Sequence, residues 1–548
     1  MIRWVFAAKL DSTIGLLLGT MMFCLSLTPS LVPREAPAQG LLAGFCFVLG
    51  YGLGLAAVSL WRYLELPSRL DAGPMLQKVS AVLCLGASSY FLWCSIGWQN
   101  SVRALMDLPP VDITYTVMVV AIALPVAGVM LVLIGIVRLV ARSVFRLTSR
   151  FIPHRAAIVL TAVLSTFIIW VVANDLLVRS VFRVLDASYS QLDSLLEPER
   201  AQPMDTDGTG GARSLVQWDE LGRAGREFVA SVPQANEISA LTGRPAREPI
   251  RVYVGLPSAE TPEERARLAL DELIRQGGFD RSVLVVMTPT GTGWLDPAAS
   301  DPLEFMTDGD VASVAVQYSY LASPISLLAQ AEYGVDTAQA LFRAVYGHWT
   351  NLPRGERPRL YLHGLSLGAL NSQISASLFE MIGDPIQGAL WSGPPFRSGL
   401  WRQITAARDA GSLARLPVFR GGHLVRFMDQ DGSSTPPGTE WGELRVVYLQ
   451  YPSDPIVFFS PADFYRRPQW LQEPLGSDVS DDLRWFPIVT GFQLVLDMLV
   501  AADAPIGHGH LYSPAHYVPA WADLLDIDWW TPEMTEALQS RAARSDDF

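Results

Sequence analysis

The chain has very little cysteine and lysine, and both are confined to its N-terminal part. The only lysines are Lys9 and Lys78, although arginine is common throughout. Such usage is typical of a protein from a GC-rich bacterial genome. Because no cysteine follows residue 94, the rest of the chain cannot form a disulfide bond. The four cysteines are Cys24, Cys46, Cys84 and Cys94.

Basic residues are also scarce beyond the first 200 residues. That first part carries 15 Lys+Arg and 11 Asp+Glu, whereas the remainder carries 26 and 43. Nucleic-acid binding requires a basic face, so the acidic remainder argues against a nucleic-acid partner. A basic, apolar part followed by an acidic part instead indicates a membrane region joined to a water-facing domain. A length of 548 residues allows two or three domains.

Apolar sequence is abundant: hydrophobic residues make up 50% of the chain and the mean hydropathy is +0.25. A helix of about 20 apolar residues can cross a bilayer, so the first part of the chain predicts about five transmembrane helices. The first run lacks a small-x-small cleavage site and is followed by four more, so we do not expect a removable signal peptide. The five runs are 13–32, 40–60, 79–96, 115–140 and 156–177.

Basic residues in the loops between these runs predict the orientation. They precede the first run, lie between the second and third, and cluster between the fourth and fifth, while the alternate loops hold only Arg34 and Arg103. Basic loops face the cytoplasm, so we expect the N-terminus inside. Five crossings would then place everything after about residue 179 outside the cytoplasm. We therefore expect a multi-pass protein of the inner (plasma) membrane, with the spans acting as an anchor.

The predicted organisation is a multi-span transmembrane domain over 1–185, a linker and helical connector over 186–248, and an α/β domain over 249–548. In the last region apolar strands alternate with helices, which predicts a mostly parallel sheet covered on both faces. The expected strands are 251–256, 282–288, 311–317, 359–363, 388–391 and 444–450, with an extra strand at 423–428. The expected helices include 262–276, 337–349 and 369–382.

A Gly-x-Ser-x-Gly motif centred on Ser366 follows the strand at 359–363 and opens the next helix. This is the sequence form of the sharp turn that lifts a nucleophilic serine above the edge of an α/β sheet. The glycines let the strand and the helix approach closely, and the turn holds the serine in a strained conformation. Ser366 is therefore the predicted nucleophile.

A serine nucleophile needs a histidine that takes its proton and an acid that orients the histidine. In sheets of this kind the acid follows the serine in the chain, and the histidine follows the acid. Asp454 lies just beyond the strand at 444–450, between two prolines, and is the preferred acid. Asp429 also follows an apolar strand and is its rival.

The histidine is expected in Gly507-His508-Gly509-His510, ahead of the last predicted helix. Either His508 or His510 fits, and His510 is favoured slightly because Tyr512 could pack the loop. A His-x-His pair could also bind a metal, but no cluster of Cys, His or carboxylates at ligand spacing accompanies it. We therefore expect no metal and no cofactor.

Acyl transfer also needs backbone N–H groups that stabilise a developing oxyanion. One should belong to Leu367, the residue after the serine, and another to the loop after an earlier strand. That loop contains Thr290, Gly291, Thr292 and Gly293. A phosphate-binding loop is excluded there because no Gly-Lys-[Ser/Thr] follows.

Taken together, these motifs resemble a bacterial family of α/β-hydrolase proteins with an N-terminal multi-span membrane domain. The resemblance covers nearly the whole chain and includes a Ser-Leu-Val-Pro-Arg run at 30–34. It implies an inner-membrane protein with a serine hydrolase fold, and it supplies no substrate. The motifs are Thr288-Pro-Thr-Gly-Thr-Gly-Trp294, His363-Gly-Leu-Ser-Leu-Gly368, Tyr451-Pro-Ser-Asp-Pro455, Arg484-Trp-Phe-Pro487 and Gly507-His-Gly-His510.

The leading hypothesis is a membrane-anchored serine hydrolase, esterase- or lipase-like, that cleaves the carboxylic ester of a lipid or another hydrophobic acyl compound. An acyltransferase with the same three residues is the nearest alternative. A non-catalytic membrane interaction protein with a hydrolase fold is the alternative from a different class. Residue patterns do not predict the oligomeric state.

Overall fold

The computed structural model describes residues 13–66, 74–153, 207–320, 331–376 and 383–545, with 156–157, 160–161, 163–165, 167, 202 and 381. The chain divides into two compact units that do not follow the order of the sequence. The first unit combines Met1–Val184 with Phe459–Ala504, and the second combines Leu185–Phe458 with Pro505–Phe548. The segment 459–504, which belongs by sequence to the predicted α/β domain, therefore packs within the first unit.

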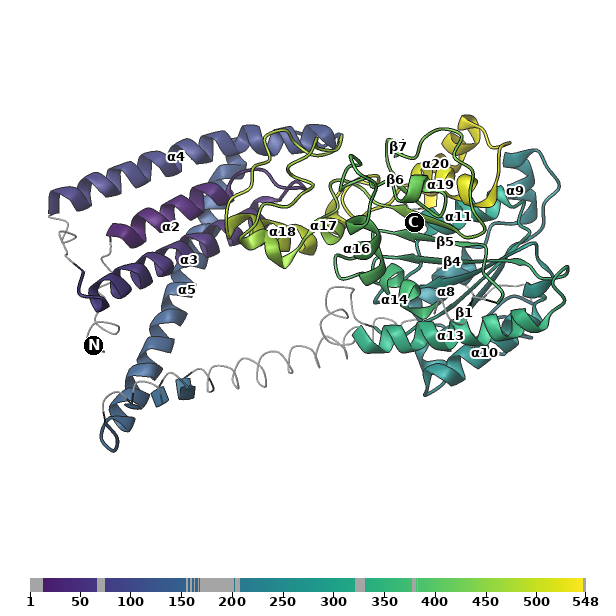
Figure 1. Ribbon diagram of the computed structural model, residues 1–548, viewed down its shortest axis with the longest axis horizontal. Coiled ribbons are helices and arrows are strands. Elements are labelled where there is room, and N and C mark those ends of the chain that lie inside the picture. Colours follow the sequence, from purple (N-terminus) through teal and green to yellow (C-terminus); the bar gives the residue numbers. More distant parts are fainter. Residues whose placement is uncertain are drawn as a thin grey trace. The chain divides into compact units, whose positions relative to one another are not determined.

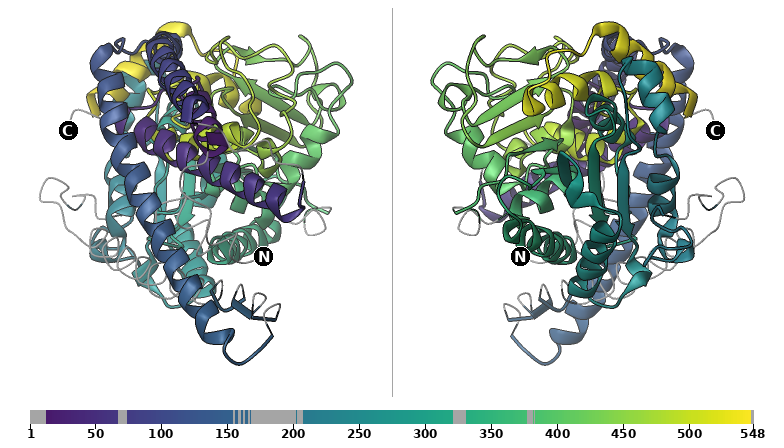
Figure 2. Two further views of the ribbon diagram at one scale, coloured as in Figure 1. Left: turned by 90° about the vertical axis from the view of Figure 1, so that its left-hand side faces the viewer. Right: turned by 90° about the vertical axis from the view of Figure 1, so that its right-hand side faces the viewer.

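The first unit contains three helices long and apolar enough to cross a membrane, so the prediction of about five spans was wrong for the described part of the chain. The first predicted run forms only α2, of 14 residues. At about 1.5 Å per residue the described part of this helix falls short of a hydrocarbon core of about 30 Å. The fifth run, 156–177, lies mostly outside the described residues. The helices are α2 (Thr13–Ser26), α3 (Ala36–Tyr63), α4 (Pro74–Leu105) and α5 (Ile113–Thr148) (Figures 1 and 2).

Glycines allow α2 and α3 to approach closely. A Cβ atom on Gly50 would lie 2.5 Å from the carbonyl oxygen of Leu18, and one on Gly54 would lie 2.6 Å from the Cα atom of Gly15. Any larger residue at these two positions would force the helices apart. Small residues at a helix–helix contact are typical of membrane helices, where close packing drives association.

The segment 459–504 binds α2 and α3 through an apolar cluster. It contains η6 (Pro461–Phe464), α18 (Val489–Leu499) and η7 (Ala501–Asp503). The ring of Phe492 meets Phe45 edge-on, with centroids 4.7 Å apart. The buried members of the cluster are Met22, Leu42, Cys46 and Val489.

A buried ion pair joins the same elements. Arg34 Nε lies 2.8 Å from Asp497 Oδ1, and both side chains are fully buried. The second carboxylate oxygen of Asp497 accepts hydrogen bonds from the Ser30 hydroxyl and the Leu31 N–H, and Arg34 Nη1 donates to Gln39 Oε1 at 2.7 Å. The Ser-Leu-Val-Pro-Arg run at 30–34, which the sequence marked only by resemblance, thus holds the segment 459–504 in the first unit.

The second unit is built on a mostly parallel sheet of eight strands, as predicted, in the order β1-β3-β2-β4-β5-β8-β6-β7. Every neighbouring pair is parallel except β6 and β7. All six residues of β2 and of β3 are buried, which explains their continuous apolar sequences. The strands are β1 (Ile250–Val254), β2 (Val283–Thr288), β3 (Val311–Val316), β4 (Arg359–Leu365), β5 (Gly388–Ser392), β6 (Val425–Asp429), β7 (Gly432–Ser433) and β8 (Arg445–Leu449).

Two groups of helices cover the sheet (Figure 1). One group contains α10 (Pro262–Arg275), α13 (Ala331–Asn351) and α14 (Leu367–Ser375). The other contains α9 (Ala235–Thr242), α11 (Pro297–Met306), α19 (Pro514–Leu525) and α20 (Pro532–Ser545). Shorter or peripheral helices are η2 (Trp218–Glu220), α8 (Gly222–Ala230), η3 (Leu256–Ser258), η4 (Gly278–Asp280), α16 (Gly399–Ala406), η5 (Arg420–Gly422) and α17 (Pro455–Phe458).

Removing only one partner of the Arg34–Asp497 pair should destabilise the first unit strongly. Asp497→Leu leaves a buried guanidinium without its carboxylate, which costs about 3–5 kcal/mol. The double variant Arg34→Met/Asp497→Leu should recover most of that loss, because no charge remains buried. Thermal unfolding of the full-length protein in detergent measures both effects.

The exposed pair between Arg103 and Glu35 supplies the matched control. The Glu35 side chain is 79% exposed, so Glu35→Gln should change the unfolding free energy by less than about 1 kcal/mol. If Asp497→Leu were as mild as Glu35→Gln, the buried pair would not be what holds the segment 459–504.

Candidate functional site

Ser366 occupies the sharp turn between β4 and α14. Its backbone has φ 57° and ψ −124°, a conformation that side-chain-bearing residues rarely adopt. The motif's glycines make the turn possible: a Cβ atom on Gly368 would lie 2.1 Å from the carbonyl oxygen of Thr288, and one on Gly364 would lie 2.4 Å from the carbonyl carbon of Gly368. β4, α14 and the end of β2 therefore meet at a distance that only glycine permits.

The turn is held by its neighbours in the sheet. The Ser366 N–H donates to the carbonyl oxygen of Ser392, at the end of β5, over 3.0 Å. Leu367 begins α14, and the first N–H groups of a helix have no acceptor within the helix. The Leu367 N–H is thus positioned as a donor beside the serine.

Asp454 and His510 form a short, buried pair. Asp454 lies in the loop after β8 and is fully buried, and its Oδ2 accepts from His510 Nδ1 at 2.7 Å. Its other oxygen accepts from the Ile456 N–H at 2.9 Å. Because a carboxylate only accepts hydrogen bonds, His510 carries its proton on Nδ1 and leaves Nε2 as the basic nitrogen.

The structure separates these two residues from the rival candidates. His508 forms a backbone bridge with Leu511 in the same loop, whereas the ion pair of Asp454 is with His510. Asp429, at the end of β6, lies 3.1 Å from Arg415 Nη1. The predicted acid and the favoured histidine are therefore the ones that meet.

His510 Nε2 is buried and has no hydrogen-bond partner among the described residues. Ser366 and His510 are thus not hydrogen-bonded as they stand. Contacts of this kind are often loose in a protein without substrate and tighten when a substrate binds. Gly393 lies against the histidine. A Cβ atom there would be 2.6 Å from His510 Cε1, so a larger residue would collide with the imidazole ring.

The histidine loop is fastened to the acid loop by contacts that the sequence reasoning missed. The Gly509 N–H donates to Ser453 Oγ at 2.8 Å, and the Tyr512 hydroxyl donates to Asp454 Oδ2 at 2.8 Å. The Ser513 N–H donates to the Tyr451 hydroxyl at 2.9 Å. From the sequence we expect Tyr512 only to pack the loop, although its spacing of two residues from His510 is a signal that both could face the acid.

The predicted oxyanion loop after β2 is a closed turn. The Thr290 N–H donates to the carbonyl oxygen of Trp294, and the Gly293 N–H donates to the carbonyl oxygen of Thr290, both over 3.0 Å. Gly293 has φ +86°, and a Cβ atom there would lie 2.5 Å from the Tyr253 hydroxyl oxygen. Two of the four proposed amides are thus used inside the loop, and those of Gly291 and Thr292 lie between them.

A buried acid follows this loop. Asp296 accepts from the Ala298 N–H at 2.9 Å and from the Tyr517 hydroxyl at 3.1 Å. Burial raises the pKa of Asp296 to about 7, although both hydrogen bonds lower it. The carboxyl group is therefore partly protonated near neutral pH.

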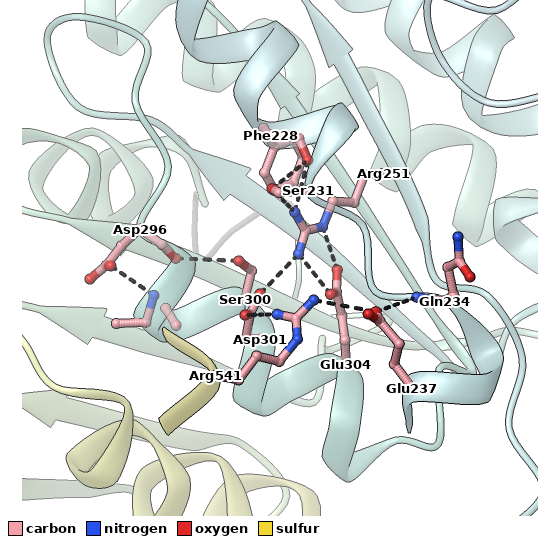
Figure 3. A network of polar contacts seen from close by, with 12 residues as sticks. Phe228, Ser231, Gln234, Glu237, Arg251, Asp296, Ser300, Asp301, Glu304 and Arg541 are labelled. Atoms are coloured by element: carbon pink, nitrogen blue, oxygen red, sulfur yellow. Dashed lines mark hydrogen bonds and ion pairs between the residues drawn. The ribbon is translucent and has the colours of Figure 1, made fainter. Parts of the chain in front are cut away.

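A network of charged side chains holds α11, the helix that follows the loop at 290–293 (Figure 3). Arg251 is on β1. Its Nε lies 2.6 Å from Glu304 Oε1, and its Nη2 lies 3.2 Å from Asp301 Oδ1. Arg541 Nη1 lies 2.8 Å from Asp301 Oδ2. Arg251 and Glu304 are almost completely buried, so each is held by the opposite charge of its partner.

No group of three His, Cys, Asp or Glu residues that could hold a metal ion occurs in the described part of the chain. His363 precedes the serine turn but is buried, with Nδ1 2.9 Å from the carbonyl oxygen of Leu390. Burial lowers the pKa of His363 to about 4, so it stays neutral. The groups available for chemistry are a serine, a histidine and an acid.

Comparison with known families agrees with this geometry. The description "alpha/beta-hydrolase family" matches residues 250–538, which is more than half of the chain. The description "alpha/beta-hydrolase family N-terminus" matches residues 27–233. No curated protein and no solved structure matches the chain. The protein therefore belongs to the alpha/beta-hydrolase family.

Proposed function

We propose that the protein is a membrane-anchored serine hydrolase that cleaves a carboxylic ester through an acyl-enzyme on Ser366. The observation that carries the proposal is the buried Asp454–His510 pair, with His510 Nδ1 2.7 Å from the carboxylate. This pair lies in the loops that follow β8 and precede α19, while the strained Ser366 turn follows β4, two strands from β8 in the sheet. In a parallel sheet the carboxyl ends of these strands lie along one edge.

The proposed reaction begins when Ser366 Oγ attacks the ester carbonyl and His510 Nε2 takes the hydroxyl proton. His510 then gives this proton to the leaving alcohol as the tetrahedral intermediate collapses to the acyl-enzyme. Water repeats the sequence and releases the acid. Asp454 holds the imidazole in the required tautomer and stabilises its positive form.

The oxyanion of the tetrahedral intermediate would be stabilised by backbone N–H groups. Leu367 at the start of α14 is the first donor. The second would come from the loop at 290–293, where the amides of Thr290 and Gly293 already donate within the loop.

The substrate class follows from the anchor. Three long apolar helices support a location at a bilayer, and many of their large side chains are exposed, for example Leu85, Trp93 and Leu124. A water-facing esterase would need no such unit. We therefore propose a lipid or another hydrophobic acyl ester as the substrate.

We also propose that the catalytic residues lie outside the cytoplasm. Arg34 precedes α3 and binds Asp497, while Ser101, near the end of α4, is 2.7 Å from Ser480. Successive spans cross in opposite directions, so both contacts belong to the same side of the membrane. The basic residues at the end of α5 belong to the other side, which the distribution of charge assigns to the cytoplasm.

The segment 459–504 continues directly into Phe458 and Pro505 of the second unit, which supports an outside location for that unit. Because the end of α5 is assigned to the cytoplasm, the proposal includes a further crossing by the predicted apolar run 156–177 before the second unit begins.

A fluorophosphonate probe tests the proposed nucleophile. Ser366→Ala should abolish labelling of the full-length protein, because no other activated serine is expected. Asp454→Asn and His510→Ala should lower the labelling rate and the hydrolysis of p-nitrophenyl esters by about a thousandfold or more.

His508→Ala is the matched control, since it removes a histidine from the same loop and keeps the His510–Asp454 hydrogen bond, and its rate should stay within about threefold of wild type. Folded wild-type protein that resisted the probe would favour the non-catalytic membrane interaction protein. Transfer of the acyl group to an added alcohol in preference to water would identify an acyltransferase.

Labelling with a membrane-impermeant maleimide tests the location. In spheroplasts of a bacterial host, Glu356→Cys in the second unit should react, whereas Ser149→Cys at the end of α5 should react only after lysis. Both positions are exposed, and the unmodified chain gives the background from its native cysteines. The reverse pattern would place the catalytic residues in the cytoplasm.

A further inference from the structure

Tyr512 makes a contact that the proposed reaction does not yet use. Its hydroxyl donates to Asp454 Oδ2 at 2.8 Å, the same oxygen that accepts from His510 Nδ1 at 2.7 Å. With the Ile456 N–H on Oδ1, the buried carboxylate accepts three hydrogen bonds. One of its two oxygens is therefore shared between the histidine and a phenol.

The loop conformation directs both side chains to the acid. The Gly507 N–H donates to the carbonyl oxygen of Leu511 at 2.8 Å, which closes the loop. His510 and Tyr512 are two residues apart and meet the same carboxylate. The Tyr512 ring also stacks on Tyr451, with centroids 4.4 Å apart and planes 20° apart, so the phenol has little freedom to leave Asp454.

The phenol remains a donor at every pH at which the enzyme would act. Tyr512 is buried, and burial together with the negative charge of Asp454 raises the pKa of its hydroxyl well above the usual value of 10.0. Unlike a histidine, the phenol does not gain a positive charge. Unlike a bound water molecule, it does not leave the site. It therefore supplies a constant hydrogen bond to the acid.

We propose that Tyr512 is a positioning residue of the catalytic site, which fixes the Asp454 carboxylate and moderates the negative charge that His510 experiences. This inference rests on the proposed function. A hydrogen bond to a carboxylate withdraws part of its charge, so the imidazolium of His510 is stabilised less than by an unshared carboxylate. The basicity of His510 would thus depend on whether Tyr512 shares Asp454 Oδ2 with it. The carboxyl group of Asp296 also interacts electrostatically with His510, and it stays in place in every variant used below.

The test is Tyr512→Phe in the full-length protein, which removes one hydroxyl and keeps the ring stack on Tyr451. The pKa of His510, followed by NMR on histidine-labelled protein and assigned with His510→Asn, should rise by about 0.5 to 1 pH unit. The acid limb of the fluorophosphonate labelling rate should move to higher pH by the same amount.

Tyr448→Phe is the matched control. Tyr448 is also buried, on β8, but its hydroxyl donates to Gln373 Oε1 at 3.1 Å and does not contact Asp454. It should leave the pKa of His510 unchanged. A second variant, Tyr512→Leu, removes the ring as well, and should lower thermal stability while shifting the pKa in the same direction as Tyr512→Phe.

An unchanged His510 pKa in folded Tyr512→Phe would overturn the inference, whether or not Ser366 reacts with the probe. An upward pKa shift in a protein that never reacts would uphold the contact between Tyr512 and Asp454 and reject the proposed hydrolase. Because NMR titration does not depend on activity, the two failures are distinguishable.

Discussion

The buried carboxylate of Asp454 is the constraint on which the candidate site depends. A carboxylate that is fully removed from water must be supplied with hydrogen bonds, and this one receives them from the Ile456 N–H, His510 and Tyr512. These donors come from two loops that are far apart in the sequence. Satisfying the carboxylate therefore assembles the histidine loop beside the acid loop and brings His510 to the acid.

The chain between Asp454 and His510 passes through the first unit. Residues 459–504 leave the second unit shortly after Asp454 and return shortly before His510, and in between they pack within the first unit. The buried Arg34–Asp497 pair and the apolar cluster around Val489 hold them there. An isolated C-terminal domain would expose that cluster and leave Asp497 without its partner. The membrane helices thus hold the segment that connects the acid loop to the histidine loop along the chain.

Hydrophobic pattern predicted the sheet well because strands buried on both faces have continuous apolar sequences, as in β2 and β3. The same pattern overestimated the spans. An apolar run such as 13–32 does not show where its helix stops, and α2 ends at Ser26, before Pro29 and Pro33. The pattern also assigned α18 and the aromatic residues around it to the α/β domain. Which partner an apolar face packs against is decided by tertiary contacts, so that assignment could not be read from the sequence.

By itself, the sequence determined the family, the mostly parallel sheet and the turn at Ser366, since these depend on local rules: buried strands need apolar runs, and a tight turn between strand and helix needs glycine on both sides. It also limited the acid and the histidine to a few candidates by their order along the chain. Only the tertiary structure showed that Asp454 meets His510 while Asp429 meets Arg415, revealed the contact from Tyr512, and paired Arg34 with Asp497. Most of these contacts join residues that are far apart in the chain, and sequence spacing does not show which of them will meet.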